Sequence, residues 1–346
     1  MISRAASDEL PRVDVVIPLF RPRRWLEACV DSVLLNRDVD LLIWLIDDDP
    51  ASSLGPVVAE RWPNVHYMLL SRNLGFAAAS NMGIGLGTAP YVLTLNQDAR
   101  LDPDYLACLV ASMSSDPRVG AAGGILRHQA DPDRPPDGTI DSAGIEFRRG
   151  RRAVDIGQGD AIRGQYAGLR EVFGVCAAAA LYRRSALESV RDPHGIFDER
   201  FYMHKEDVDL AWRLRRAGFR ALVDDRARAY HARGVHRASD VPLTGPRSAV
   251  RAVRWLFRQE RAKAPDLRRR AFRNQMLMLI KNENVSDLAR SLPDIAFVLT
   301  AQTVISAMLD PIGTVAGRAD LVRRLPGAFR ARRSAPVQGS VARWLP

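Results

Sequence analysis

Short apolar runs alternate with amphipathic stretches along the first third of the chain. The first run, residues 13–19, is rich in β-branched residues, and a stretch with helical periodicity follows at 25–35. A continuous apolar run is typical of a strand buried on both faces, and apolar spacing of three to four residues is typical of a helix. The same reasoning predicts strands at 41–47, 65–70 and 91–95, and helices at 57–62, 76–86 and 103–113. The alternation indicates an α/β fold with a mostly parallel central sheet.

The regular pattern weakens after residue 127 and returns in the second half. Residues 127–165 are rich in Gly, Asp, Arg and Pro, which predicts surface loops with an edge hairpin at 144–159. Ordered segments are expected at 171–182 and 221–224, with a helix that begins near Glu206. From residue 241 the pattern is helical and basic. We therefore divide the chain into an α/β domain at 1–240, with halves at 12–100 and 101–240, and a helical extension at 241–346.

The net charge of +10 is concentrated in that extension. Residues 241–346 hold 19 basic and 7 acidic residues, which leaves 31 basic and 33 acidic residues in 1–240. A nucleic-acid enzyme usually spreads its basic surface over the main domain, so nucleic acid is not an expected partner. A basic tail on a neutral body instead suggests docking to an anionic surface, with solvated arginines as the alternative interpretation.

An apolar segment within the extension, residues 296–309, has no charged residue and is flanked by arginine-rich stretches. Its 14 residues are fewer than the roughly 20 that cross a bilayer. The segment therefore predicts either a helix lying in the membrane interface or a helix packed on the main domain. An oligomer contact is a further alternative.

Several other classes of protein are disfavoured by what the sequence contains. Its three cysteines are far apart, which argues against a disulfide framework or a zinc site. The first residues show no apolar signal segment, so we expect a cytoplasmic location. The glycine-rich run at 81–87 does not follow the first strand, as a dinucleotide-binding motif would, and no P-loop motif is present.

Acidic side chains follow two of the predicted strands. Asp47, Asp48 and Asp49 follow the second strand, and Asp98 follows the fourth. Ligands of parallel sheets bind beyond the carboxyl ends of the strands, where carboxylates can hold Mg²⁺ or Mn²⁺ against a diphosphate. Asp98 is our first choice for a metal ligand, although a single aspartate at a strand end more often forms a turn or caps a helix.

A second acidic group, Glu206 and Asp207, begins the helix of the second half. An ionised carboxylate is stabilised at a helix N-terminus, where it can act as a base towards an acceptor hydroxyl. Asp209 and Arg213 are four residues apart and are expected to pair on the helix surface. His231 can add an imidazole ligand to a carboxylate metal site, and a histidine with no ligand role is the alternative.

Four segments together resemble family two glycosyltransferases, most closely their rhamnosyltransferase-like and galactofuranosyltransferase-like members. They read VVIPLF, RNLGFAAASNMGI, LTLNQDARLDPDYL and GIFDERFYMHKEDVDLAWRLRRAGFRALVDDRARAYH, in the family's order over about residues 12–240. The resemblance implies a GT-A fold with a nucleotide-binding half and an acceptor-binding half. It also implies inverting transfer by one direct displacement, with a divalent metal.

The resemblance also implies roles for individual residues. Asp207 falls on the family's base, Asp98 on the last position of its metal-binding signature, and His231 on a third metal ligand of some members. Glu206 and Trp212 are expected at the acceptor. Contacts to the nucleotide sugar are expected from residues of the first half of the chain: Pro18, Asp47, Asp49, Arg72, Asn73, Gly75, Asn81, Asn96 and Gln97.

The chain departs from the family pattern at three places. The metal signature is reduced to Asn96-Gln97-Asp98, so the first carboxylate is missing. The turn after the first strand reads Leu-Phe-Arg where the family commonly has Thr-Tyr-Asn. Asp49 is the best match to the residue that reads the base or ribose, with Asp47 as the alternative, and His204 stands where an aromatic residue is common.

These observations predict an inverting glycosyltransferase at the inner face of the cell membrane. Its donor is expected to be dTDP-rhamnose or a UDP-sugar, and its acceptor a hydroxyl of a lipid-linked or cell-envelope glycan. One alternative is a GT-A protein that binds nucleotide or carbohydrate without catalysis. The other is a nucleotidyltransferase, which would normally need a glycine-rich phosphate loop after the first strand.

Overall fold

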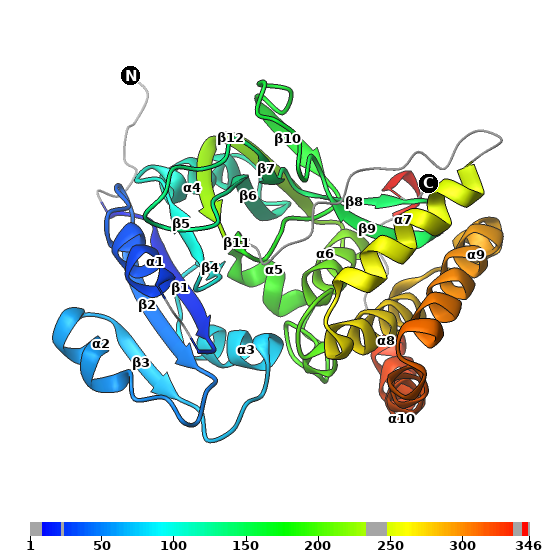
Figure 1. The fold of residues 1–346 in the computed structure, drawn as a ribbon. Coiled ribbons are helices and arrows are strands. Elements are labelled where there is room, and N and C mark those ends of the chain that lie inside the picture. The colour runs from blue at the N-terminus through cyan, green and yellow to red at the C-terminus, as the bar shows by residue number, and fades with distance from the viewer. Residues whose placement is uncertain (1–8, 22–23, 233–247, 335–340, 345–346) are drawn as a thin grey trace.

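The computed structural model describes residues 9–21, 24–232, 248–334 and 341–344. Figure 1 shows the N-terminal strands and helices on one side of the molecule and the C-terminal helices α7–α10 on the other side, with α6 between them. The fold is one large sheet with helices on both faces, a small second sheet, and a helical extension at one end.

The first half confirms the predicted alternation of strands and helices. Its elements are β1 (Arg12–Leu19), α1 (Trp25–Leu34), β2 (Asp40–Asp47), α2 (Gly55–Arg61), β3 (His66–Leu69), α3 (Phe76–Leu86) and β4 (Tyr91–Leu95). The pairs β1–β2, β2–β3 and β1–β4 are all parallel. From Val13 to Leu19 every residue of β1 is buried, because helices cover both faces of this strand.

The second half contains more strands than the sequence predicted. Its elements are β5 (Ala99–Leu101), α4 (Tyr105–Ser114), β6 (Val119–His128), β7 (Ile140–Ser142), β8 (Ile145–Arg148), β9 (Arg152–Asp155), β10 (Leu169–Val172), β11 (Ala179–Arg183), α5 (Arg184–Ser189), α6 (Glu206–Arg216) and β12 (Arg220–His231). The hairpin expected at 144–159 exists as β8–β9, but it forms its own two-stranded sheet rather than an edge of the main one.

The main sheet has the order β10-β12-β6-β11-β4-β1-β2-β3. Along this path all strands except β10 and β11 run in the same direction, since β11 is antiparallel to both β4 and β6 and β10 is antiparallel to β12. The sheet is therefore mostly parallel, as expected. Because β4 and β12 run in the same direction, Asp98 and His231 lie at the same edge, where β5 pairs with the end of β12.

The extension is helical, as predicted, and packs against the second half. It consists of α7 (Ser248–Ala262), α8 (Pro265–Asn282), α9 (Val285–Leu309) and α10 (Pro311–Ser334). A shared apolar cluster joins it to the main domain, with Phe201 and Trp212 on one side and Leu277 and Met278 on the other. Burial of a cluster of this kind stabilises the attachment by the hydrophobic effect.

Helix α9 is longer and more apolar than the sequence analysis expected. Its segment Asp287–Leu309 has 23 residues with a mean hydropathy of 1.6 and is 22% buried. In the described part of the chain it is the one helix whose length and composition would suffice to cross a membrane. The expectation of a segment too short to span therefore needs correction, because the helix continues through Asp294 towards its N-terminus.

Candidate active site

Two acidic residues begin helix α6, as the sequence predicted. Glu206 is buried and Asp207 is half-buried, and Asp207 Oδ1 accepts a hydrogen bond of 2.8 Å from the backbone N–H of Val208. The residue before them, Lys205, has a left-handed backbone with φ of 74°, so the chain turns sharply into the helix. Unpaired N–H groups and the helix dipole at this end favour negative charge.

The two acids differ in their environment. Burial, and after it the charge of Asp207, raises the pKa of Glu206 to about 8. The Oε2 atom of Glu206 has no hydrogen-bond partner among the described residues. Glu206 therefore keeps its proton at neutral pH, which leaves Asp207 as the more accessible carboxylate of the pair.

Asp98 and His231 lie together at the ends of β4 and β12. His231 Nε2 is 3.4 Å from Asp98 Oδ1, and the amide nitrogen of Asn96 is 3.2 Å from the same imidazole nitrogen. Behind them, Asp141 Oδ2 is 2.8 Å from His231 Nδ1, and both side chains are buried. Sequence reasoning missed Asp141, because it is brought into the site only by the pairing of β7 with β6.

These contacts shift the pKa values of His231 and Asp98. Burial by itself lowers the pKa of His231, but the hydrogen bonds to Asp141 and Asp98 outweigh it and raise the pKa to about 9. Burial would raise the pKa of Asp98, but the contact with His231 lowers it overall. The His231 imidazole thus lies between two carboxylates, the buried Asp141 and the partly exposed Asp98.

The aspartates after β2 have three different roles. Asp47 is fully buried and accepts hydrogen bonds from Tyr67 Oη at 2.8 Å and from the Asp49 N–H at 3.1 Å. Asp48 accepts from the N–H groups of Leu74 and Gly75 at 2.6 and 2.7 Å, so it holds the loop before α3. Asp49 is more exposed and is 3.3 Å from the guanidinium group of Arg21.

The loop from Arg72 to Gly75 touches the segment that leads into α6. Gly75 has φ of 86°, and a Cβ atom there would collide with the ring of Tyr202. The Tyr202 hydroxyl donates a hydrogen bond to Asn73, while Arg72 is exposed. The glycine is therefore required both by its backbone conformation and by the close approach of the aromatic ring.

Gln97, in the loop after β4, contacts the turn after β1, and Pro18 is a residue of β1 itself. Gln97 Oε1 accepts from the Phe20 N–H at 2.8 Å, and Gln97 Nε2 donates to the Phe20 carbonyl at 3.0 Å. Pro18 is buried within β1, opposite Ile46 of β2. These contacts fix the turn after β1 to the loop that carries Asp98.

The packing around α3 and α6 corrects two sequence-based predictions and gives the contacts of a third residue. Trp212 is fully buried against Phe147 and Phe173, so it is a core residue and does not reach an acceptor. The amide group of Asn81 exchanges hydrogen bonds with the backbone of Phe197, so it joins α3 to that segment, and its contact with the donor stays a prediction. Asp209 and Arg213 do pair, at 2.9 Å, but both are buried rather than on the helix surface.

A short segment, residues 174–178, connects the two acidic groups. Gly174 packs directly on Ala211 of α6, and the Ala178 carbonyl accepts a hydrogen bond of 2.9 Å from the Asn96 N–H. A chain rises at most about 3.3–3.6 Å per residue, so these two attachment points are within about 14 Å of one another. The segment 174–178 thus joins the middle of α6 to the loop after β4.

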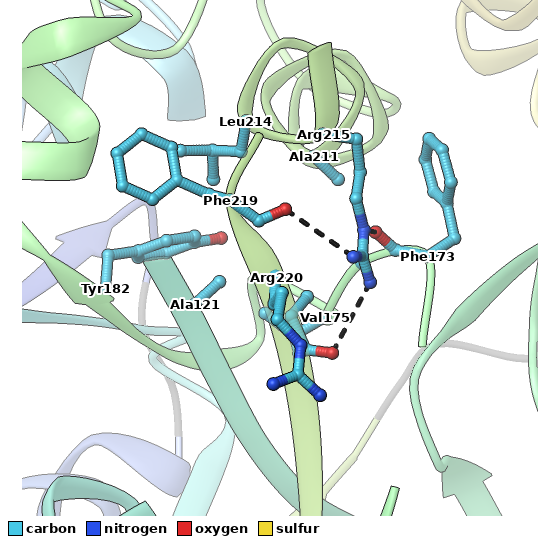
Figure 2. A pocket seen from close by; sticks show the side chains of 11 residues that line it. Ala121, Phe173, Val175, Tyr182, Ala211, Leu214, Arg215, Phe219 and Arg220 are labelled. Carbon is cyan, nitrogen blue, oxygen red and sulfur yellow. Dashed lines mark hydrogen bonds between the residues drawn. The ribbon is translucent and has the colours of Figure 1, made fainter. Parts of the chain in front are cut away.

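The pocket drawn in Figure 2 is not part of this group. It lies between the C-terminal half of α6 and the sheet, with Phe173, Tyr182 and Phe219 around it. The guanidinium group of Arg215 donates to the Phe219 carbonyl at 3.5 Å across it. None of the residues predicted to bind or react lines this pocket, so we regard it as a packing gap.

The Asp98–His231 pair has the chemistry of a divalent metal site. An octahedral ion with ligands at about 2.1 Å places neighbouring ligand atoms about 3 Å apart, close to the observed 3.4 Å. Asp141 fixes the imidazole from behind, as carboxylates do for metal-bound histidines. In the part of the chain that is described, no cluster of three or more His, Cys, Asp or Glu residues could hold an ion.

The fold is of the GT-A type, and comparisons with known proteins give the class. A family model described as "Glycosyl transferase family 2" matches residues 14–191, and the chain belongs to this family. The protein is therefore a glycosyltransferase.

The names of two curated relatives refer to rhamnosyl transfer and to O-antigen biosynthesis. The chain is 28% identical over 249 residues to the N-acetylglucosaminyl-diphospho-decaprenol L-rhamnosyltransferase of Mycobacterium tuberculosis, covering 65% of this chain and 76% of that protein. It is 26% identical over 240 residues to the O-antigen biosynthesis protein RfbC of Myxococcus xanthus, covering 66% of this chain and 18% of that protein.

A solved structure supports the fold. The crystal structure of GalNAc-T7 with UDP, GalNAc and Mn²⁺ aligns with a TM-score of 0.59 at 14% identity. The alignment covers 97% of this chain, which spans about 60% of the length of that protein. At this identity the similarity establishes the GT-A fold alone.

Proposed function

We propose that this chain is an inverting glycosyltransferase in which Asp207 is the base. The observation that carries the proposal is the pair at the start of α6, in which a buried Glu206 with a raised pKa lies beside a more accessible carboxylate. The Asp98–His231 pair, connected to α6 through residues 174–178, supplies the complementary donor side.

The proposed reaction is a single displacement. The Asp207 carboxylate takes the proton of the acceptor hydroxyl while that oxygen bonds to the anomeric carbon of the donor sugar. The bond from the anomeric carbon to the diphosphate oxygen breaks, and its electron pair leaves with the nucleoside diphosphate. Attack opposite to the leaving group inverts the anomeric configuration.

Asp98 and His231 are the proposed metal ligands, for Mg²⁺ or Mn²⁺. A bound ion would neutralise negative charge on the diphosphate as it leaves. Asp141 would keep the imidazole of His231 turned towards the ion, and Asn96 would remain beside it. The exposed side of Asp98 supports this assignment, because substrate oxygens need access to the same ion.

On the donor side we propose contacts from Asp49, Arg72 and Asn73. Arg72 is exposed at the loop held by Asp48, and Asp49 lies at the end of β2 beside Arg21. Asp47 is buried beneath them and supports the turn. The remaining predicted donor residues, Pro18, Gly75 and Gln97, shape the backbone around this position.

For the substrates we propose dTDP-rhamnose as donor, with a UDP-sugar as the second choice, and a lipid-linked glycan as acceptor. The proposal is supported by the name of the mycobacterial relative, which specifies L-rhamnosyl transfer to N-acetylglucosaminyl-diphospho-decaprenol. The O-antigen biosynthesis relative is consistent with a cell-envelope glycan.

We further propose that α10 docks the enzyme on an anionic lipid surface at the inner face of the membrane. Exposed residues recur along one face of α10 with spacings of three and four, and those residues are Ile312, Val315, Ala319, Val322, Pro326 and Phe329. Arg323 and Arg330 are exposed beside this face. Arginines flanking an apolar face would repel those of a second copy of the chain, but they attract anionic lipid.

The test is transfer by the purified protein from a panel of nucleotide sugars to a lipid-linked N-acetylglucosamine diphosphate, with Mn²⁺ present. Asp207→Asn is expected to keep nucleotide-sugar affinity and to lose turnover, whereas Asp104→Asn, which changes an exposed carboxylate, is expected to behave like wild type. Normal turnover of Asp207→Asn would overturn the assignment of the base. Donors that all remain intact would instead support the binding protein without catalysis.

A further inference from the structure

Helix α8 of the extension contacts the loop that leads into the acidic end of α6. The side-chain amide of Asn274 donates to the carbonyls of Phe201, Met203 and His204 at 3.1, 3.0 and 2.6 Å. Asn274 is fully buried, so water does not compete for these bonds. One side chain of the extension thus binds three backbone carbonyls of the loop just before Glu206.

The loop needs such support, because its backbone is unfavourable on its own. Tyr202, His204 and Lys205 have φ values of 66°, 74° and 74°, in the left-handed region that non-glycine residues rarely adopt. Strained conformations persist only where surrounding contacts determine them. The neighbouring Arg273 adds a further bond of 2.9 Å to the Phe201 carbonyl.

The same loop touches the donor side of the site. The Tyr202 hydroxyl binds Asn73, its ring packs on Gly75, and its carbonyl accepts from the Ala77 N–H at 3.0 Å. The guanidinium group of Arg270 on α8 lies over the Tyr202 ring, at 4.0 Å from its centroid. The loop therefore connects the extension, the acceptor-side acids and the donor-side loop.

A second contact fixes α6 itself. Lys281 and Asn282, both about two turns of α8 further on, bind the two oxygens of Asp209 at 2.8 and 2.7 Å. Asp209 is two residues after Asp207 on α6. Helix α8 thus holds both the loop before Asp207 and the first turn after it.

We infer that Asn274 is a positioning residue for the transfer reaction, which it serves by holding the loop 201–205 and thereby the carboxylate of Asp207. The inference rests on the proposed role of Asp207 as base. Asn274 is remote from the substrates in this account and acts through the backbone of the loop. The C-terminal extension is then part of the catalytic unit.

The test compares two neighbouring buried amides on α8. Asn274→Ala removes the bonds to the loop, whereas Gln275→Ala removes a 2.8 Å bond to the Arg151 carbonyl, elsewhere in the extension interface. Since a displacement of about 1 Å can lower a rate roughly 100-fold, Asn274→Ala is expected to lower kcat by about that factor with little change in the affinity for nucleotide sugar. Gln275→Ala is expected to keep kcat near the wild-type value.

Hydrogen exchange of the peptides covering 201–209 provides a readout independent of activity. Faster exchange in Asn274→Ala but not in Gln275→Ala is expected, and Asn274→Ser, which keeps one donor, should fall between them. Equal losses in both alanine variants, or unchanged exchange of the loop, would overturn the inference. A wild-type protein that transfers no sugar would refute the proposed function alone, because the exchange experiment would still decide whether Asn274 holds the loop.

Discussion

The ammonium group of Lys281 on α8 lies 2.8 Å from the carboxylate of Asp209 on α6, and neither side chain has exposed surface. Lys281 also contacts Asp192 at 2.6 Å and Asp198 at 2.8 Å. One cation of the extension therefore contacts carboxylates from three places in the second half of the main domain, together with Arg200 and Arg213. Burial raises the pKa of Asp198, but Arg200 and Lys281 lower it overall, so this carboxylate stays charged.

Replacement of Lys281 by methionine should destabilise the protein strongly. Removing one partner from a buried ion pair leaves an uncompensated charge, at a cost of about 3–5 kcal/mol. Arg290→Met is the control, since Arg290 is 76% exposed and its contact with Asp287 is long, at 3.5 Å. Denaturant unfolding should place the control within about 0.5 kcal/mol of wild type. A loss no larger for Lys281→Met than for the control would contradict the view that Lys281 holds the two parts together.

The raised pKa of Glu206 predicts a dependence of stability on pH. Because its folded pKa of about 8 is above the ordinary glutamate value of about 4.3, the folded state keeps a proton that the unfolded state releases. Its contribution is fully present below the unfolded value and is lost as the pH rises towards 8. In Glu206→Gln the free energy of unfolding should therefore fall less than in wild type as the pH rises towards 8. The difference between the two proteins should be a few kcal/mol at most. Parallel pH profiles for the two proteins would refute the assignment.

Asp141 should support metal binding without touching the metal. Loss of the carboxylate behind a metal-bound histidine typically lowers metal affinity about 10- to 100-fold. Asp141→Asn should show this decrease in Mn²⁺ titrations with a nucleoside diphosphate present. Asp137→Asn is the matched control, because Asp137 also contacts a histidine, His128 at 2.7 Å, in a more exposed position. Unchanged Mn²⁺ affinity in Asp141→Asn would remove His231 from the proposed ligands.

The first half of the fold could be predicted because its strands carry their own signal. Residues 13–19 and 91–95 are short apolar runs with β-branched residues, and they pair as parallel strands in the centre of the sheet. Strand β6, with the sequence VGAAGGILRH, was not predicted, because Gly and Ala have weak strand preference. It forms because β11 and β12 pair with its two edges and Tyr105 Oη accepts a hydrogen bond from the Gly124 N–H.

The site could be predicted only where a motif was continuous in the sequence. Glu206 and Asp207 are adjacent, and Asp98 ends a clear strand, so both were found. Asp141 and Asn274 were missed, since their partners are 90 and about 70 residues away and isolated polar residues carry no such signal. Trp212 was misassigned because the sequence cannot distinguish which apolar face of α6 meets the extension.

The exposed face of α10 makes a last prediction, about vesicle binding. Ile312 and Val315 are 83% and 70% exposed, and burying one such side chain in an apolar environment is worth about 1.5–3 kcal/mol. The double variant Ile312→Glu, Val315→Glu should therefore bind vesicles with anionic lipid at least about tenfold more weakly than wild type. Wild-type binding should also weaken with added salt, because the flanking arginines contribute through charge.

The control for vesicle binding is an exposed valine on the opposite side of the molecule. Val57, on α2, is 52% exposed and lies far from the extension in Figure 1. Val57→Glu should bind anionic vesicles as wild type does. If the arginines contribute to binding, both wild type and Val57→Glu should bind neutral vesicles weakly. If the α10 double variant binds as tightly as Val57→Glu, this face does not dock on lipid. A loss of dimers in solution without a change in vesicle binding would instead identify it as a contact between copies of the chain.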